Sequence, residues 1–330
     1  MEDTPFVQEC LTATDLSSMP DEIILQRTLT TKSIISTPSS FIHQSEQPLD
    51  RRDRDLQMMT EIGKGFQGSI FEKVGCPLAL KKEHPGNERL RSNLTKEYAL
   101  HRALLDAVHQ YGTIGGVRVP FLFSIVRSTD VDFWDSNLSK FPFGYRNPGT
   151  LVKMERILPL PKISRKALIN CFYPREGNTP LDTTLAQRIL EDISNKHCLV
   201  RPYLGKYDNT YTREKFSSLE HLQLDTVRMA SSMGNTYAMM HWGSGINGDD
   251  VEFVLGTSTV REPGTNTADS QKRSVGLYLI DFGQCEWVDL SEDCEVVYQA
   301  FKGAMVTGDN QLFIPNYQKS PELFAAFKGA

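Results

Sequence analysis

Three short stretches decide the fold of this chain: IGKGFQGSI at residues 62–70, LALKK at 78–82 and LYLIDFG at 277–283. The first is a Gly-x-Gly-x-x-Gly turn between two extended segments, where backbone N–H groups can approach phosphate oxygens closely. The second ends an apolar run in Lys81, and the third ends a buried-strand pattern in Asp281. Each stretch occurs often by chance, so only their combination in this order is informative.

A glycine loop, a strand lysine and an acidic residue follow one another in protein kinases in this order. The sequence therefore predicts an α+β, two-lobed, protein-kinase-like fold. Its β-rich N-lobe would span residues 55–157, and a reduced, mainly helical C-lobe would span 158–330, because only 47 residues follow Gly283. Residues 1–54 are rich in Ser, Thr, Pro and Gln and are predicted to form a disordered N-terminal arm.

The glycine loop is the first candidate binding element. The extended SIFEKV that follows it favours a strand-to-strand loop over a strand-to-helix dinucleotide turn, and an ordinary glycine hairpin is the alternative. In the binding interpretation the glycines contact phosphates and an aromatic side chain caps the loop tip. These residues are Gly63, Gly65, Phe66 and Gly68.

Lys81 would hold nucleotide phosphates, and a carboxylate must then hold Lys81. Glu97 lies 16 residues later on a predicted helix over residues 88–110 and is the candidate partner. A surface lysine and a solvated helix glutamate are the alternative interpretation. The stretch from Glu155 to Ile157 would form the hinge between the lobes, with its backbone contacting adenine.

The candidate metal and catalytic residues lie in the second half of the chain. Asp281 would bind Mg²⁺, and Glu252, at the start of the strand VEFVL, would be the second metal ligand. The kinase base lies five residues before the second ligand, and this position holds Asn247, whose amide cannot take a proton. Asp249 or Asp250 could replace it, although both also suit a solvated turn.

Composition excludes several classes of protein. The net charge of −5 disfavours nucleic acid as a partner, and no run of about 18 apolar residues predicts a membrane span. The N-terminus is acidic and polar, unlike a signal peptide. Cysteines at positions 10, 76, 171, 198, 285 and 294 are scattered, without zinc-site spacing, which favours an intracellular, cytoplasmic or nuclear location.

The chain also resembles a fungal kinase-like family that is known only as a domain of unknown function. The resemblance covers roughly residues 57–325, and it rests on KEYALHRAL (96–104), LVKMERILPLP (151–161), CLVRPYLG (198–205), MHWGSGINGDDVEFVLG (240–256), LYLIDFGQC (277–285) and GDNQLFIPNY (308–317). It implies a two-lobed fold without a known substrate. Members often carry the name zinc finger protein, which these cysteines do not support, and they usually have Asp where this chain has Asn247.

These observations leave two functions open. The chain is expected to bind ATP and Mg²⁺, either as an ATP-dependent phosphotransferase with an unknown small-molecule or protein acceptor, or as a pseudokinase that acts as an interaction or regulatory module. Asn247 separates the two, because the transferase needs Asp249 or Asp250 in its place. A zinc-dependent DNA-binding protein is disfavoured by charge and by cysteine spacing.

Overall fold

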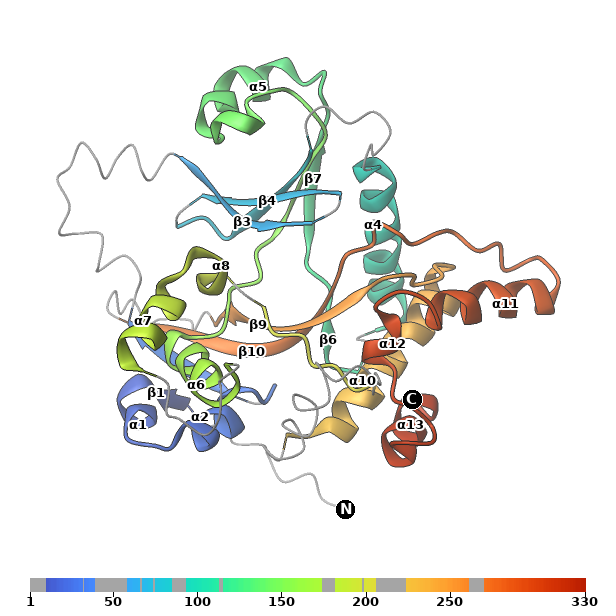
Figure 1. Ribbon diagram of the computed structural model, residues 1–330. Coiled ribbons are helices and arrows are strands. Elements are labelled where there is room, and N and C mark those ends of the chain that lie inside the picture. Colours follow the sequence, from blue (N-terminus) through green and yellow to red (C-terminus); the bar gives the residue numbers. More distant parts are fainter. Residues whose placement is uncertain are drawn as a thin grey trace.

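The computed structural model describes residues 10–31, 33–38, 58–65, 67–73, 75–84, 93–112, 115–173, 182–197, 199–205, 224–260 and 270–330. In these residues the chain is a mixed α+β protein built on two five-stranded sheets (Figure 1). No helix among them combines the length and the apolar character that crossing a membrane requires.

The first sheet carries the glycine loop and is antiparallel throughout. Its strands, in spatial order, are β3 (Met59–Lys64), β4 (Gly68–Lys73), β5 (Leu78–Glu83), β8 (Leu151–Glu155) and β7 (Leu122–Val126). Helix α4 (Leu94–Tyr111) follows β5, and its Leu94 packs against Leu122 and Val152 on the inner face of the sheet. The Asn93 side chain caps α4 by accepting a hydrogen bond from the Lys96 amide, so the predicted helix begins at Leu94.

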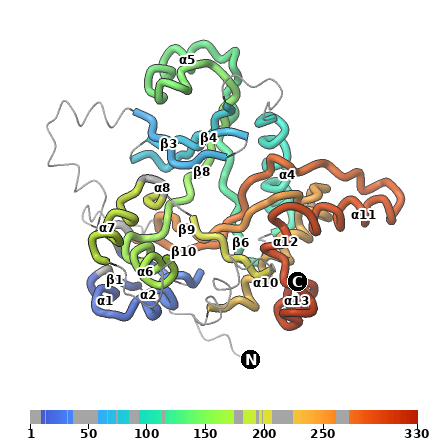
Figure 2. Tube along the Cα trace, viewed as in Figure 1, coloured from blue at the N-terminus to red at the C-terminus, as the bar shows by residue number. Residues whose placement is uncertain are grey.

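The second sheet centres on the hairpin of β9 (Glu252–Thr259) and β10 (Ser270–Ile280). Strand β10 is long enough to pair also with β2 (Ile34–Pro38) and with β6 (Val117–Arg118), and β1 (Cys10–Thr12) extends the sheet beyond β2. Most of the remaining helices surround this sheet (Figure 2). They are α6 (Lys162–Phe172), α7 (Thr183–Glu191), α8 (Ile193–Lys196), α10 (Thr226–Ala238), η5 (Met239–Gly243), α11 (Cys294–Met305), α12 (Asn310–Phe313) and α13 (Pro321–Lys328).

Two short crossings join the sheets. Residues 119–121 lead from β6 in the second sheet to β7 in the first. Residues 156–158 lead back from β8, and Leu158 then forms an antiparallel bridge with Thr257 of β9. The second crossing forms three backbone hydrogen bonds, to Pro77 and Thr257, and the first is held to the second by the bond from the Glu155 amide to the Phe121 carbonyl.

The prediction of a disordered arm over residues 1–54 is wrong for the described part of that segment. Residues 10–38, except residue 32, form β1, α1 (Ala13–Ser17), α2 (Asp21–Thr28) and β2. Six of their apolar side chains are buried in the main core, namely Leu11, Leu16, Ile24, Leu25, Leu29 and Ile35. The polar composition concealed these short apolar groups, which gain stability only by packing on β10 and α6. Residues 1–9 and 39–54 lie outside the described residues.

The insertion between β7 and β8 covers the outer face of the first sheet. It contains α5 (Val131–Asn137), η3 (Leu138–Lys140) and η4 (Phe143–Tyr145), and α5 lies above this sheet in Figure 1. Phe141 and Tyr145 contact the Phe71 ring edge-on, with ring centroids 5.2 and 4.8 Å away, and Trp134 packs in the same cluster. The outer face is therefore a closed structural core.

Candidate functional site

Three of the predicted site residues meet between the first sheet and α4. Lys81 lies on the inner face of β5, Glu97 in the first turn of α4, and Asp281 directly after β10. The Lys81 ammonium donates to Glu97 Oε1 at 2.6 Å and to Asp281 Oδ1 at 3.4 Å. Residues that are 16 and 200 positions apart along the chain therefore form one charged cluster.

The charge of this cluster is set by opposing effects. Burial alone would lower the pKa of Lys81, but Glu97 and Asp281 outweigh it and raise this pKa, so the ammonium is charged at neutral pH. Burial raises the pKa of Glu97, and its Oε2 is buried without a hydrogen-bond partner. The Asp281 side chain keeps 45% of its surface exposed, so it is the member of the cluster that solvent can reach.

Asp281 lies in a turn that is held in place by the buried residue after it, Phe282. Its φ of +64° lies in the left-handed region, where residues other than glycine are uncommon. The next side chain, Phe282, is buried and stacks on His101 of α4, with ring centroids 4.6 Å apart. Burial lowers the pKa of His101 to about 4, so the ring is neutral when it packs there. The contact with Phe282 thus fixes where Asp281 stands relative to α4.

The glycine loop lies next to the turn that carries Asp281. The Gly65 amide donates to the Gly68 carbonyl at 2.9 Å and closes the turn between β3 and β4. A Cβ on Gly68 would lie 2.4 Å from the Lys82 carbonyl oxygen, so close strand packing requires this glycine. A Cβ on Gly283 would lie 2.3 Å from Gln67 Nε2, which places the Gln67 side chain against the turn after Asp281. Phe66 lies outside the described residues.

The two amides at the start of the predicted hinge already form hydrogen bonds within the protein. The Glu155 amide donates to the Phe121 carbonyl at 2.7 Å, and the Arg156 amide donates to the Pro77 carbonyl at 3.0 Å. The Arg156 guanidinium pairs with Glu72. An adenine contact through the amide of Glu155 or Arg156 would have to displace one of these backbone hydrogen bonds.

The loop that should carry the catalytic base is bound to its surroundings. Asn247 Oδ1 accepts hydrogen bonds from the amides of Glu286 at 2.9 Å and Asp249 at 3.2 Å, so it serves as a loop anchor. Asp249 accepts from the Thr307 hydroxyl at 3.0 Å. Asp250 accepts from the Asp309 amide at 3.3 Å. In the part of the chain that the structure describes, none of these three side chains forms a hydrogen bond with Lys81 or Asp281.

Glu252 lies at the same sheet end as Asp281, because it pairs with Ile280 in the β9–β10 register. Burial raises its pKa, and Arg201 counteracts this by holding both carboxylate oxygens at 2.7–2.9 Å. A magnesium ion would have to compete with this guanidinium for the same oxygens. The described residues also contain no group of three or more His, Cys, Asp or Glu side chains able to hold a metal. The arrangement does not fit a magnesium site built on Glu252 and Asp281.

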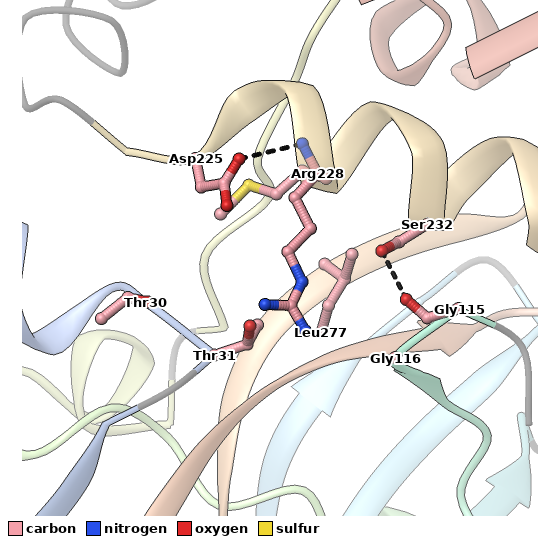
Figure 3. Close-up of a pocket in the computed structure, with 9 residues that line it drawn as sticks. Thr30, Thr31, Gly115, Gly116, Asp225, Arg228, Ser232 and Leu277 are labelled. Carbon is pink, nitrogen blue, oxygen red and sulfur yellow. Dashed lines mark hydrogen bonds between the residues drawn. The ribbon is translucent and has the colours of Figure 1, made fainter. Parts of the chain in front are cut away.

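A separate pocket opens beside the N-terminus of α10 (Figure 3). Its lining includes Thr31, Gly116, Arg228 and Leu277, and Ser232 closes one side by donating to the Gly115 carbonyl at 2.6 Å. None of the predicted site residues lines it. We assign it no role in the chemistry of the cluster around Asp281.

Comparison of the chain with models of known protein families found no match, and a search of curated proteins found no similar sequence. The residues of the site must therefore be judged on their own geometry. Three side chains at the corner were missed from the sequence: Gln67, His101 and Arg201. Arg201 carried the clearest signal, since it is the charged residue inside the otherwise apolar CLVRPYLG stretch.

Proposed function

We propose that the chain is a nucleotide-binding protein with a two-lobed, protein-kinase-like arrangement, and that the corner around Lys81 receives the phosphates. The observation that carries this proposal is the contact of Lys81 with both Glu97 and Asp281. Protein kinases use such a lysine–glutamate pair from the third strand and the following helix, beside an acidic metal ligand. The first lobe would end at β8, and residues 156–158 would form the link to the second.

The architecture of the first sheet supports the same proposal. A glycine turn joins its first two strands, the lysine lies on the third strand, and a helix that supplies the glutamate comes before the last two. Gln67 of the glycine turn lies against Gly283, so the turn faces the Asp281 segment. Phosphates bound there would contact Lys81 and the backbone amides of the turn.

The experiment is a thermal unfolding series with ATP, with and without Mg²⁺, on the wild type and two variants. Nucleotide at about 100 times its dissociation constant should add roughly 2.7 kcal/mol of stability to the wild type. Lys81→Met combined with Glu97→Gln should remove most of this gain, because the variant lacks the cation that would contact the phosphates and leaves no buried carboxylate without its partner. Asp135→Asn, an exposed change on α5, is the matched control and should keep the gain. No stabilisation of the wild type at millimolar nucleotide would refute nucleotide binding.

The pseudokinase alternative is favoured by the loop around Asn247. With Asn247 Oδ1 bound to two backbone amides, the side chain is an anchor, and the Asp250 carboxylate accepts a hydrogen bond from the Asp309 amide. Several large apolar side chains on η5, on α11 and on the segment before α11 are exposed, as in an interaction module; they are Trp242, Trp287, Leu290, Val296 and Tyr298.

The rate of ATP hydrolysis distinguishes a phosphotransferase from a pseudokinase. In a pseudokinase, Asn247→Asp leaves ATP hydrolysis at background, because the new carboxylate would still point at the amides of Asp249 and Glu286. In a phosphotransferase, Asn247→Asp or wild-type Asp250 must support measurable turnover, and Asp250→Asn would then reduce it by about 10²–10⁴-fold.

A further inference from the structure

Arg201 and Glu252 form a two-point ion pair near the candidate site. Arg201 Nε and Nη2 both donate to the Glu252 carboxylate, over distances of 2.7–2.9 Å. Such a two-point pair matches the planar guanidinium to the planar carboxylate and is stronger than a single ammonium contact.

The backbone holds this pair in place. Val200 forms a bridge with Leu255 of β9, with hydrogen bonds of 2.7 and 3.3 Å in the two directions. Arg201 is the next residue, so its side chain begins beside β9 and reaches Glu252 at the start of the same strand. The guanidinium therefore stands at the sheet end where Asp281 also lies.

We infer that Arg201 takes the place of a divalent cation at Glu252, and that nucleotide phosphates bind this site through Arg201 and Lys81 without a metal on Glu252. This inference rests on the proposed nucleotide binding. A metal on Glu252 would lie directly beside the Arg201 guanidinium, which already contacts both carboxylate oxygens, and two adjacent cations repel each other. Arg201 neutralises Glu252, and Lys81 is shared by Glu97 and Asp281, so both cations are already held at the site by carboxylates.

Arg201 can also reach a ligand. Its bonds to Glu252 use Nε and Nη2, and 44% of its side-chain surface is exposed. The Nη1 edge is thus left for a phosphate oxygen. Guanidinium groups are well suited to phosphate because their fixed fork donates to two oxygens at once.

The first arm of the test measures nucleotide affinity by calorimetry in EDTA and in Mg²⁺. The wild type should bind ATP in EDTA with nearly the affinity seen in Mg²⁺. Arg201→Met should weaken binding in EDTA by about tenfold or more, the size of one charge-assisted contact. Arg228→Met, an exposed arginine on α10, is the matched control and should bind like the wild type. Wild-type binding that disappears in EDTA would overturn the inference.

The second arm uses Mn²⁺ alone, followed by its electron paramagnetic resonance signal, and does not depend on nucleotide. The wild type should bind Mn²⁺ weakly, Arg201→Met should bind it more tightly, and Arg201→Met with Glu252→Gln should lose that gain. Tight Mn²⁺ binding by the wild type that Glu252→Gln abolishes would overturn the inference. If Arg201→Met does not fold, Arg201→Lys keeps the charge without the fork and serves instead. A wild type that binds no nucleotide in either buffer refutes the proposed function, while the Mn²⁺ arm still decides whether Arg201 excludes a metal.

Discussion

Two neighbouring lysines on β5 have opposite surroundings. Lys81 faces α4 and Asp281, whereas Lys82 faces the insertion that contains α5. Both residues are buried, with 9% and 0% of their surface exposed. Lys81 has two carboxylate partners, while Lys82 Nζ has no hydrogen-bond partner in the described structure and lies over the Trp134 ring, 5.3 Å from its centroid.

The difference separates the two faces of the first sheet. Burial lowers the pKa of Lys82, and the nearby charge of Glu83 offsets this only in part. The pKa of Lys81 is raised, because Glu97 and Asp281 more than offset burial. A buried cation is costly unless it is paired. On the inner face, Glu97 and Asp281 compensate the positive charge of Lys81, and Asp281 is exposed enough to meet a ligand. On the outer face, the positive charge of Lys82 is compensated only in part, inside a closed core.

The largest expected effect is on the inner face. Lys81→Met should destabilise the protein by about 3–5 kcal/mol, because it leaves the buried Glu97 carboxylate without its partner. The free energy of unfolding in urea measures this. Adding Glu97→Gln should recover most of the loss, since a neutral amide needs no cation. A Lys81→Met protein as stable as the wild type would show that Glu97 is not held by this pair.

The same substitution on the outer face should act in the opposite direction. Lys82→Met removes a buried ammonium that lacks a hydrogen bond, and the methionine side chain is long enough to fill the same space. The free energy of unfolding should therefore rise by about 1–3 kcal/mol. Urea unfolding of Lys82→Met beside Lys81→Met gives a matched pair. Destabilisation by Lys82→Met would mean that contact with Trp134 outweighs the cost of burying the charge.

Strand alternation allowed much of the inner face to be predicted from sequence. Consecutive residues of a strand point to opposite faces, so an apolar run ending in Lys81 places that lysine on the face of the following helix. Glu97, on that helix, and Asp281, at the end of a strand pattern, followed from motif order.

Features that depend on long-range packing could not be predicted. The buried groups of residues 10–38 gain their stability from β10 and α6, which lie more than 120 residues away along the chain. The pairing of Arg201 with Glu252 depends on the bridge of Val200 with Leu255, which leaves no local signal. The anchoring of Asn247 by the Glu286 amide likewise joins segments 39 residues apart.

The pH dependence of stability should also differ between the faces. The folded pKa of Lys82 lies below its unfolded value of about 10.4, so the unfolded state binds more protons in between and stability rises with pH there. The advantage of Lys82→Met over the wild type should therefore shrink between pH 7 and pH 10. Lys81 has a raised folded pKa, so its contribution is fully present below about 10.4 and lost above it. Lys81 itself therefore adds no pH dependence to the stability of the wild type over the same range. Urea unfolding of the wild type and of Lys82→Met at several pH values checks the trend.

The smallest expected effect tests whether the outer face is independent of the site. The Tyr145 hydroxyl lies 2.6 Å from Ser69 Oγ, and Ser69 also donates to Glu61 Oε1 at 2.7 Å. Tyr145→Phe removes the short bond to Ser69 and two long contacts, to Glu61 at 3.4 Å and to His84 at 3.5 Å, but leaves Ser69 bonded to Glu61. It should therefore cost only about 1 kcal/mol in urea unfolding. Nucleotide affinity should not change, because Tyr145 packs on Phe71, and its contact with His84, which bonds the Gly65 carbonyl, is long. The opposite result would be a nucleotide affinity that falls with Tyr145→Phe but not with Asp135→Asn. It would show that the insertion transmits strain through β4 and β5 to the glycine turn, so that the two faces act as one unit.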